Sequence, residues 1–123
     1  MLFRSPDEGF GGFGVRRPLR FLAHKLELDE KQVVEMARIL DDLKTERAQA
    51  AVDDRRTLAD FADAFSTEAF DAAKSSAGAR RRIDANQKLQ AAITRALGQI
   101  HACLNPEQRT RLAYLIRSGV LQV

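Results

Sequence analysis

Apolar residues recur at three- and four-residue steps along two long stretches of the chain, residues 30–64 and 67–103. In the first stretch and just after it, one stripe consists of Met36, Leu40, Leu43, Ala51, Leu58, Phe61 and Phe65. The stripe of the second stretch consists of Phe70, Ala73, Ile83, Ile93, Leu97 and Ile100. This period is that of an amphipathic helix, and neither stretch contains a proline. Because each stripe needs another helix to cover it, we predict a long antiparallel hairpin of two helices.

Capping residues indicate where the two long helices begin. Asp29 is placed to cap the first helix, with the acidic Glu30 in its first turn near the positive end of the helix dipole. Between the two stretches, Ser66 or Thr67 predicts the start of the second helix, with Glu68 in its first turn. The hairpin is therefore expected to turn at about Ser66.

A short helix is expected at each end of the hairpin. Pro18 suits the start of a two-turn helix, which either covers the open end of the bundle or lies on a membrane or an acidic partner. At the other end, Asn105 caps a last helix that has Pro106 at its first position and closes at Gly119. The apolar tail in residues 120–123 then covers part of the core or a dimer contact.

Together these elements predict an all-α fold, a four-helix hooked hairpin that forms a single helical domain in residues 18–123. Residues 1–17 are rich in glycine and phenylalanine and are predicted to be a flexible arm. With 30% charged residues and no tryptophan, the slender hairpin is expected to bury too little apolar surface by itself. We therefore expect a homodimer.

The two long helices carry opposite charge. Residues 26–76 contain seven basic and thirteen acidic side chains, whereas residues 77–123 contain eight basic and two acidic ones. In an antiparallel pair, Asp53 and Asp54 come opposite the three arginines at positions 80–82. Much of the positive charge then has an internal partner, so we do not expect nucleic acid as a partner in spite of the net charge of +3.

Two charged residues interrupt the apolar stripe of the first long helix. Arg47 and Asp54 occupy positions where apolar residues are expected. Either the middle of the hairpin is thin and hydrated, with both groups paired across the helices, or they form a polar notch that selects the register or holds a ligand.

The sequence also bears on the compartment of the protein. No apolar stretch approaches the eighteen residues of a transmembrane segment, and the N-terminus lacks the pattern of an export signal. We expect a cytoplasmic protein if Met1 is the true start, and a periplasmic one if an export signal is missing from the sequence. The single cysteine, Cys103, cannot form an internal disulfide, which fits a reducing compartment.

Two related five-residue motifs begin helices at the same end of the predicted hairpin, LDEKQ at residues 28–32 and LNPEQ at residues 104–108. They resemble the LTxxQ repeats of the Spy/CpxP family, which includes periplasmic heavy-metal sensors of the CnrX and ZraP kind. Asp29 and Asn105 stand in place of the threonine and keep its capping role. The shared motif residues are Leu28, Gln32, Leu104 and Gln108. The resemblance covers roughly residues 26–119 and implies a hooked helical hairpin that dimerises, with a role as a chaperone or in sensing stress or metals.

The metal chemistry of those sensors depends on several histidines, often with methionine and acidic ligands, and this chain has only two histidines. The candidate ligands at the motif end are His101, Cys103, Glu35 and Met36. His101 and Cys103 are two residues apart, which on a helix directs them about 200° from each other. We therefore expect neither a metal site nor another cofactor.

No catalytic constellation is visible in the sequence. No serine or cysteine nucleophile lies at a useful spacing from a histidine, and the carboxylates lie among basic residues on solvated helix surfaces. We predict a non-enzymatic dimeric binding module that holds protein segments or a regulatory partner. One alternative is a heavy-metal-responsive regulator, and a further one is a DNA-binding dimer that uses Arg109, Arg111 and Arg117 on the last helix.

Overall fold

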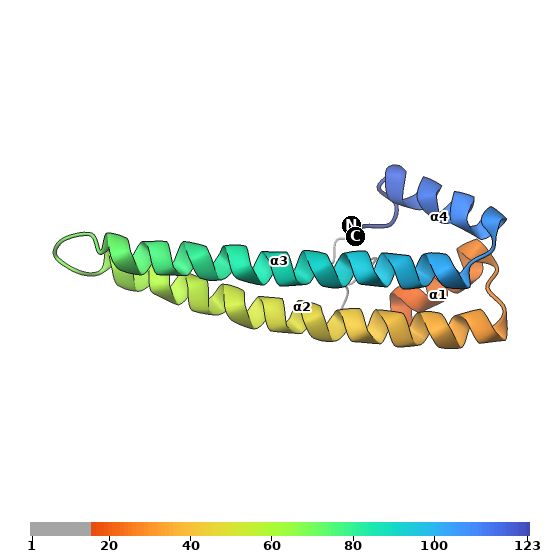
Figure 1. Cartoon of the computed structure of the whole chain (residues 1–123), viewed down its shortest axis with the longest axis horizontal. Helices are drawn as coiled ribbons and strands as arrows, with labels where there is room; N and C mark the ends of the chain where they lie inside the picture. Colours follow the sequence, from red (N-terminus) through yellow and green to blue (C-terminus); the bar gives the residue numbers. More distant parts are fainter. Residues whose placement is uncertain (1–15) are drawn as a thin grey trace. The chain divides into compact units, whose positions relative to one another are not determined.

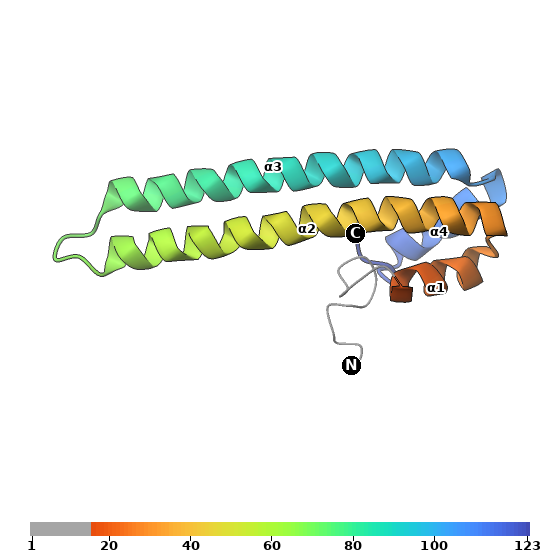
Figure 2. The same ribbon diagram turned by 90° about the horizontal axis from the view of Figure 1, so that it is seen from below.

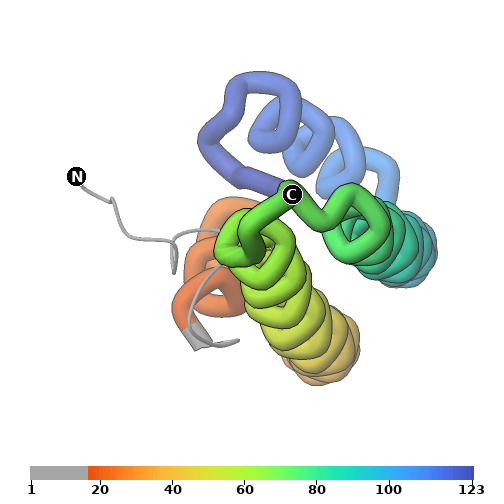
Figure 3. The backbone as a smooth tube through the Cα atoms, turned by 90° about the vertical axis from the view of Figure 1, so that its left-hand side faces the viewer, coloured from red at the N-terminus to blue at the C-terminus, as the bar shows by residue number. Residues whose placement is uncertain are grey.

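The computed structural model describes residues 16–123, and these residues form four α-helices and no strand (Figure 1). The helices are α1 (Arg16–Leu26), α2 (Glu30–Phe65), α3 (Ala72–Cys103) and α4 (Pro106–Arg117). Helices α2 and α3 pack closely as a hairpin and run side by side (Figures 2 and 3). The predicted all-α hairpin with a short helix at each end is therefore confirmed. The predicted dimer stays a prediction.

The glycine- and phenylalanine-rich arm predicted for residues 1–17 falls almost entirely outside the described residues, which begin at Arg16. Within the described part, Arg16 and Arg17 belong to α1.

The chain divides into two compact units. What we call the terminal unit comprises residues 16–45 and 93–123 of the described chain, and what we call the turn unit comprises Glu46–Ala92. Each unit has its own set of buried residues. The prediction of a single domain in residues 18–123 stays a prediction.

Apolar side chains fill the core of the terminal unit. The buried set is Leu22, Leu26, Met36, Ile39, Leu40, Leu43, Ile93, Ala96, Ile100, Leu104, Leu112, Leu115 and Leu121. Leu22 and Leu26 are fully buried, so α1 packs into this core, which is one of the two roles considered for it. Gly119, with a φ of +81°, ends α4 in the left-handed conformation expected there, and the chain beyond it returns Leu121 to the core. Four helices therefore supply this unit with the apolar burial that stabilises a fold.

The core of the turn unit differs from the sequence-based expectation. The buried positions are the small or polar Thr57, Asp60, Ala64, Gly78 and Ala92. Most of the predicted stripe is instead exposed, namely Leu58 (53%), Phe65 (83%), Phe70 (63%) and Ile83 (59%), together with Ala51 and Ala73. The prediction that the other long helix covers these side chains was wrong.

Helix rotation explains the error in the turn unit. In α2 the buried residues are Thr57, Asp60 and Ala64. Leu58 follows Thr57 directly and therefore points about 100° away from it around the helix. In the terminal unit α1, α3 and α4 together can cover a wide arc of α2, but in the turn unit α3 alone covers a narrow one. The apolar stripe therefore lies beside the buried arc of α2 in this unit.

The second long helix begins later than predicted. Helix α3 starts at Ala72, and neither Ser66 nor Thr67 caps it. Their hydroxyls donate instead to the carbonyls of Asp63 (3.3 Å) and Ala64 (3.4 Å) at the end of α2. Asp71 provides the cap, because its carboxylate accepts from the backbone N–H of Lys74 at 3.0 Å.

Candidate functional site

The first motif begins α2 with a reciprocal pair of hydrogen bonds. The carboxylate of Asp29 accepts from the backbone N–H of Gln32 at 2.8 Å, and the Gln32 side-chain oxygen accepts from the backbone N–H of Asp29 at 3.0 Å. This arrangement is a capping box, in which two backbone donors that the helix cannot satisfy are both paired. The cap predicted at Asp29 is confirmed.

The second motif begins α4 in the same way. The Asn105 side chain accepts from the backbone N–H of Gln108 at 2.8 Å, and the Gln108 side-chain oxygen accepts from the backbone N–H of Asn105 at 3.0 Å. Pro106 occupies the first turn, where its missing N–H leaves no donor unpaired. The predicted cap and proline position are both confirmed.

The two motif glutamines also bind each other. Gln32 Nε2 donates to Gln108 Oε1 at 2.8 Å, and Gln108 Nε2 donates to Gln32 Oε1 at 3.1 Å. The second proton of each amide goes to a carbonyl at the end of another helix. Gln32 of α2 donates to the Cys103 carbonyl at the end of α3 (2.9 Å), and Gln108 of α4 donates to the Leu26 carbonyl at the end of α1 (3.1 Å). Each amide thus makes two donated and two accepted bonds, its full capacity.

This glutamine pair is largely shielded from solvent, since Gln108 is buried and Gln32 is half-buried. It joins the starts of α2 and α4 to the ends of α3 and α1. The leucines of the motifs lie beside it, with Leu104 buried and Leu28 half-buried. Sequence reasoning identified the caps but missed the amide pair, because residues 76 positions apart give no local signal of contact.

A sequence profile described as the LTXXQ motif family protein matches residues 15–115 of the chain, the part that contains both motifs. The chain belongs to the LTXXQ motif family. This is the Spy/CpxP-like family that the two motifs resemble, a family of helical, non-enzymatic, chaperone- or sensor-like proteins that are typically periplasmic. Comparisons with curated proteins and with solved structures found no match.

The four candidate metal ligands have different surroundings in this LTXXQ-family chain. Met36 is fully buried in the terminal core and His101 is exposed. The hydrogen bond and charge of Arg38 lower the pKa of Glu35, which forms an ion pair with it. Burial, together with the charges of Glu35 and Asp29, raises the pKa of the Cys103 thiol and so disfavours the thiolate that binds metals. Across residues 16–123, no three His, Cys, Asp or Glu side chains are grouped as a metal site requires.

Two of the three arginines considered for DNA binding are engaged within the terminal unit. Arg109 Nε donates to the His101 carbonyl at 2.9 Å, and Arg111 donates to the Lys25 carbonyl at 3.1 Å and pairs with Glu27 at 3.6 Å. These contacts hold α4 against its neighbours. The guanidinium groups are therefore partly committed to the fold.

One face of the turn unit is apolar and carries a groove of about 340 Å³. Residues from both long helices line it, namely Ala50, Asp54, Arg82, Ile83, Ala85, Asn86 and Leu89. Leu58 lies one helical turn beyond Asp54 on the same side of α2. We call Leu58, Phe61, Ile83 and Leu89, with this groove between the helices, the apolar face.

Two oppositely charged residues, one from each long helix, form an ion pair at the apolar face. Arg82 pairs with Asp54 at 2.7 Å, and its guanidinium lies 5.4 Å from the centre of the Phe61 ring. The cross-helix pairing predicted for Asp54 is therefore confirmed. Arg47 is different, since its Nε is buried without a hydrogen-bond partner and burial lowers the pKa of its guanidinium.

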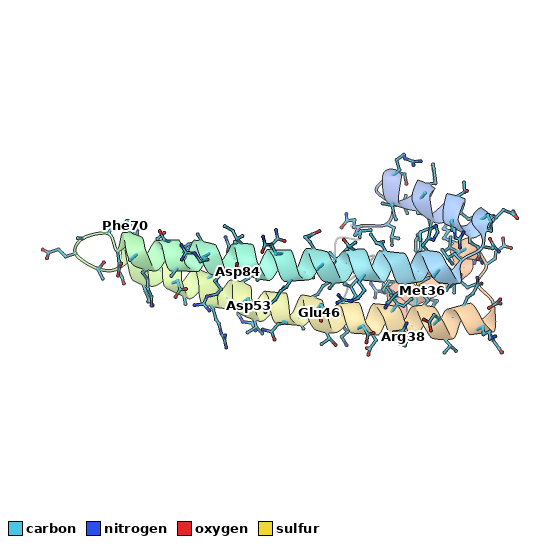
Figure 4. The ribbon with its side chains drawn as sticks, in the orientation of Figure 1. Met36, Arg38, Glu46, Asp53, Phe70 and Asp84 are labelled. Atoms are coloured by element: carbon cyan, nitrogen blue, oxygen red, sulfur yellow. The ribbon has the colours of Figure 1, made fainter. Side chains whose placement is uncertain are left out.

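The opposite face of the turn unit is charged. A groove of about 360 Å³ there is lined by Asp53, Ala77, Arg80, Arg81, Asp84, Ala85 and Lys88. Figure 4 labels Asp53 on α2 and Asp84 on α3. At the buried edge, Asp60 pairs with Arg81 at 3.1 Å and with Lys74 at 3.8 Å. The turn unit is therefore a helix pair with one apolar face and one face of mixed charge.

None of the helices in residues 16–123 has both the length and the hydropathy that crossing a membrane would require.

Proposed function

We propose that this LTXXQ-family protein is a non-enzymatic binding module that holds segments of other proteins on the apolar face of its turn unit. The observation that carries the proposal is the exposure of Leu58 and Ile83 on a face that no element of residues 16–123 covers. Exposed apolar surface beside a groove is typical of sites that bind proteins.

The chemistry of the apolar face suits unfolded segments. The groove offers alanine, isoleucine and leucine side chains to an apolar residue of the client, and Asp54, Arg82 and Asn86 offer polar contacts to the client backbone. Neither set of groups selects one particular sequence. A module of this kind binds many clients with modest affinity, since ordering a flexible segment opposes binding.

The proposal includes a homodimer in the periplasm. The turn unit buries few large apolar side chains, so a second copy would add burial that this unit lacks. The periplasm is the typical compartment of the LTXXQ family. Sedimentation velocity of the purified protein tests the dimer, and fractionation of cells that express the gene from its natural start tests the compartment.

The client-holding role is tested by suppression of aggregation. Reduced α-lactalbumin serves as the client, and light scattering follows its aggregation at a stoichiometric amount of the protein. The double variant Leu58→Ser with Ile83→Ser removes apolar groups from the apolar face. The matched control is Val34→Ser, because Val34 is 71% exposed but lies on α2 in the terminal unit.

We expect the wild type and Val34→Ser to suppress aggregation equally, and the double variant to lose at least half of the suppression. Both variants should keep the wild-type helical circular dichroism, because all the changed side chains are exposed. Unchanged client aggregation with the wild type, or full suppression by the double variant, would contradict the proposal.

A further inference from the structure

Two exposed phenylalanines lie at the turn between α2 and α3, Phe65 at the end of α2 and Phe70 just before α3. Figure 4 labels Phe70 at this turn. They are 83% and 63% exposed, the first being the most exposed large apolar side chain recorded in residues 16–123. Connecting turns are normally built from glycine, proline and small polar residues. Two large aromatic side chains at such a place call for an explanation.

The folding of the turn does not need these rings. The backbone N–H of Asp71 donates to the Ala64 carbonyl at 3.0 Å, which closes the turn. The hydroxyls of Ser66 and Thr67 bond to nearby carbonyls, and Asp71 caps α3. These polar contacts fix the path of the chain, so the phenylalanines are displayed by an ordered turn.

The sequence around the two rings is acidic. Residues 63–73 contain the three carboxylates of Asp63, Glu68 and Asp71 and no basic side chain. The nearest cation in sequence, Lys74, lies 3.8 Å from Asp60 and is thus partly neutralised. We call Phe65, Phe70 and these three carboxylates the acidic turn.

The two exposed rings and the three carboxylates of the acidic turn together determine the chemistry that a partner must have. Aromatic side chains that become buried contribute much of the affinity of protein interfaces, so the partner must offer apolar groups to the two rings. Charge complementarity requires that lysine or arginine border those groups. Nucleic acid and anionic lipid are both repelled by three carboxylates, so a basic protein surface is the occupant that fits.

We infer that the acidic turn docks onto a partner protein, on a surface where apolar side chains are bordered by lysine and arginine. This site is separate in composition and in residues from the apolar face. The protein therefore has one surface for clients and a second for a basic partner.

A synthetic amphipathic helical peptide of leucine and lysine serves as the probe, and an analogue with glutamate in place of lysine is its counterpart. Fluorescence anisotropy measures binding to the full-length protein at several salt concentrations. The double variant Phe65→Ser with Phe70→Ser removes the rings. The variant Asp63→Asn with Glu68→Gln removes charge and keeps the rings, and it leaves the Asp71 cap in place.

We expect the lysine peptide to bind the wild type, and the phenylalanine double variant to bind it at least tenfold more weakly. The charge variant should bind it more weakly at low salt and with a smaller dependence on salt, because exposed charges are screened. The glutamate peptide should not bind. Leu58→Ser with Ile83→Ser should change binding of the lysine peptide less than twofold.

Wild-type affinity of the phenylalanine double variant, or equal binding of the two peptides, would overturn the inference. If Leu58→Ser with Ile83→Ser abolishes binding of the lysine peptide and the phenylalanine double variant still binds it, the inference fails while the client-holding proposal stands. Self-association that disappears in the phenylalanine variant would make the occupant a second copy of this chain, which would also overturn it. Conversely, peptide binding at the turn without suppression of client aggregation would retain the inference and reject the proposed function.

Discussion

In the terminal unit, Met36 and Ile100 on the two long helices are fully buried, whereas in the turn unit Leu58 and Ile83 on the same two helices are more than half exposed. The buried positions of the turn unit include Thr57 and Asp60. Both units contain a part of each long amphipathic helix, α2 and α3. Only the terminal unit also contains α1 and α4, which cover its apolar side chains.

The difference shows that the apolar residues of one long helix can be covered in one part of the chain and exposed in another. Where additional helices cover it, the stripe supplies most of the burial that stabilises the fold. Where only one helix lies alongside, the covered arc is narrow and small or polar residues fill it. The apolar side chains beside that arc, such as Leu58 and Ile83, remain exposed.

The largest expected effect is the cost of truncating a leucine in the terminal unit. Leu22→Ala removes a fully buried side chain and is expected to lower the free energy of unfolding by about 2–5 kcal/mol. The same change in the turn unit, Leu58→Ala, is expected to cost less than about 1 kcal/mol. Urea unfolding followed by circular dichroism measures both. Equal losses would remove the distinction between the units.

The glutamine pair gives the next largest effect. Gln108→Ala leaves the buried Leu26 carbonyl and the Asn105 N–H without partners and is expected to cost about 1–3 kcal/mol. In the turn unit, Gln49→Ala removes an exposed and long hydrogen bond of 3.4 Å and is expected to cost at most about 0.5 kcal/mol.

A double-mutant cycle sharpens the test of the glutamine pair. Because Gln32 and Gln108 bond to each other, the double change to alanine should cost less than the sum of the single changes, by about 0.5–3 kcal/mol. Strict additivity would show that the two amides act independently.

Replacing each of the two glycines of α3 with alanine should change the free energy of unfolding in opposite directions. In the turn unit, a Cβ on Gly78 would lie 3.0 Å from the Asp60 Cβ and 3.1 Å from the Phe61 ring, so Gly78→Ala is expected to destabilise by about 1 kcal/mol or more. In the terminal unit, nothing lies within 4 Å of a Cβ on Gly98, and Gly98→Ala should stabilise by about 0.5–1 kcal/mol. Thermal melts of the two variants compare them directly, and a stabilised Gly78→Ala would contradict the close helix contact.

The smallest effect is expected at Arg47. Its buried Nε has no partner, so Arg47→Met keeps the aliphatic part of the side chain and removes an unsatisfied donor. The variant should be more stable by about 0.5–1 kcal/mol, whereas Arg82→Met should gain nothing, because Arg82 is paired with Asp54. A destabilised Arg47→Met would show that Arg47 has a partner, such as a ligand or a second copy.

The local features of the chain were predictable from its sequence. The caps at Asp29 and Asn105 and the left-handed Gly119 depend only on neighbouring residues, and all three are confirmed. The start of α3 was not predictable in this way, since Ser66, Thr67 and Asp71 are all good capping residues and only the closed turn decides among them.

Predicting which residues are buried in the turn unit, and that the two glutamines meet, requires more than local sequence information. Whether Thr57 or Leu58 faces α3 depends on the rotation of α2 and on how many helices surround it. Likewise, Gln32 and Gln108 meet only after four helix ends have come together. For the candidate site, the sequence therefore supplied the motifs and the apolar residues but not the face on which each would lie.

Segment-resolved hydrogen exchange of the free protein tests most directly whether stability is concentrated in the terminal unit. Amides at residues 36–43 and 96–104 should exchange most slowly, and those at residues 54–65 and 78–90 should exchange at least tenfold faster, because few large apolar contacts oppose local opening there. Equal protection across both units would contradict the account, since it would mean that the turn unit is as stably folded as the core around Met36.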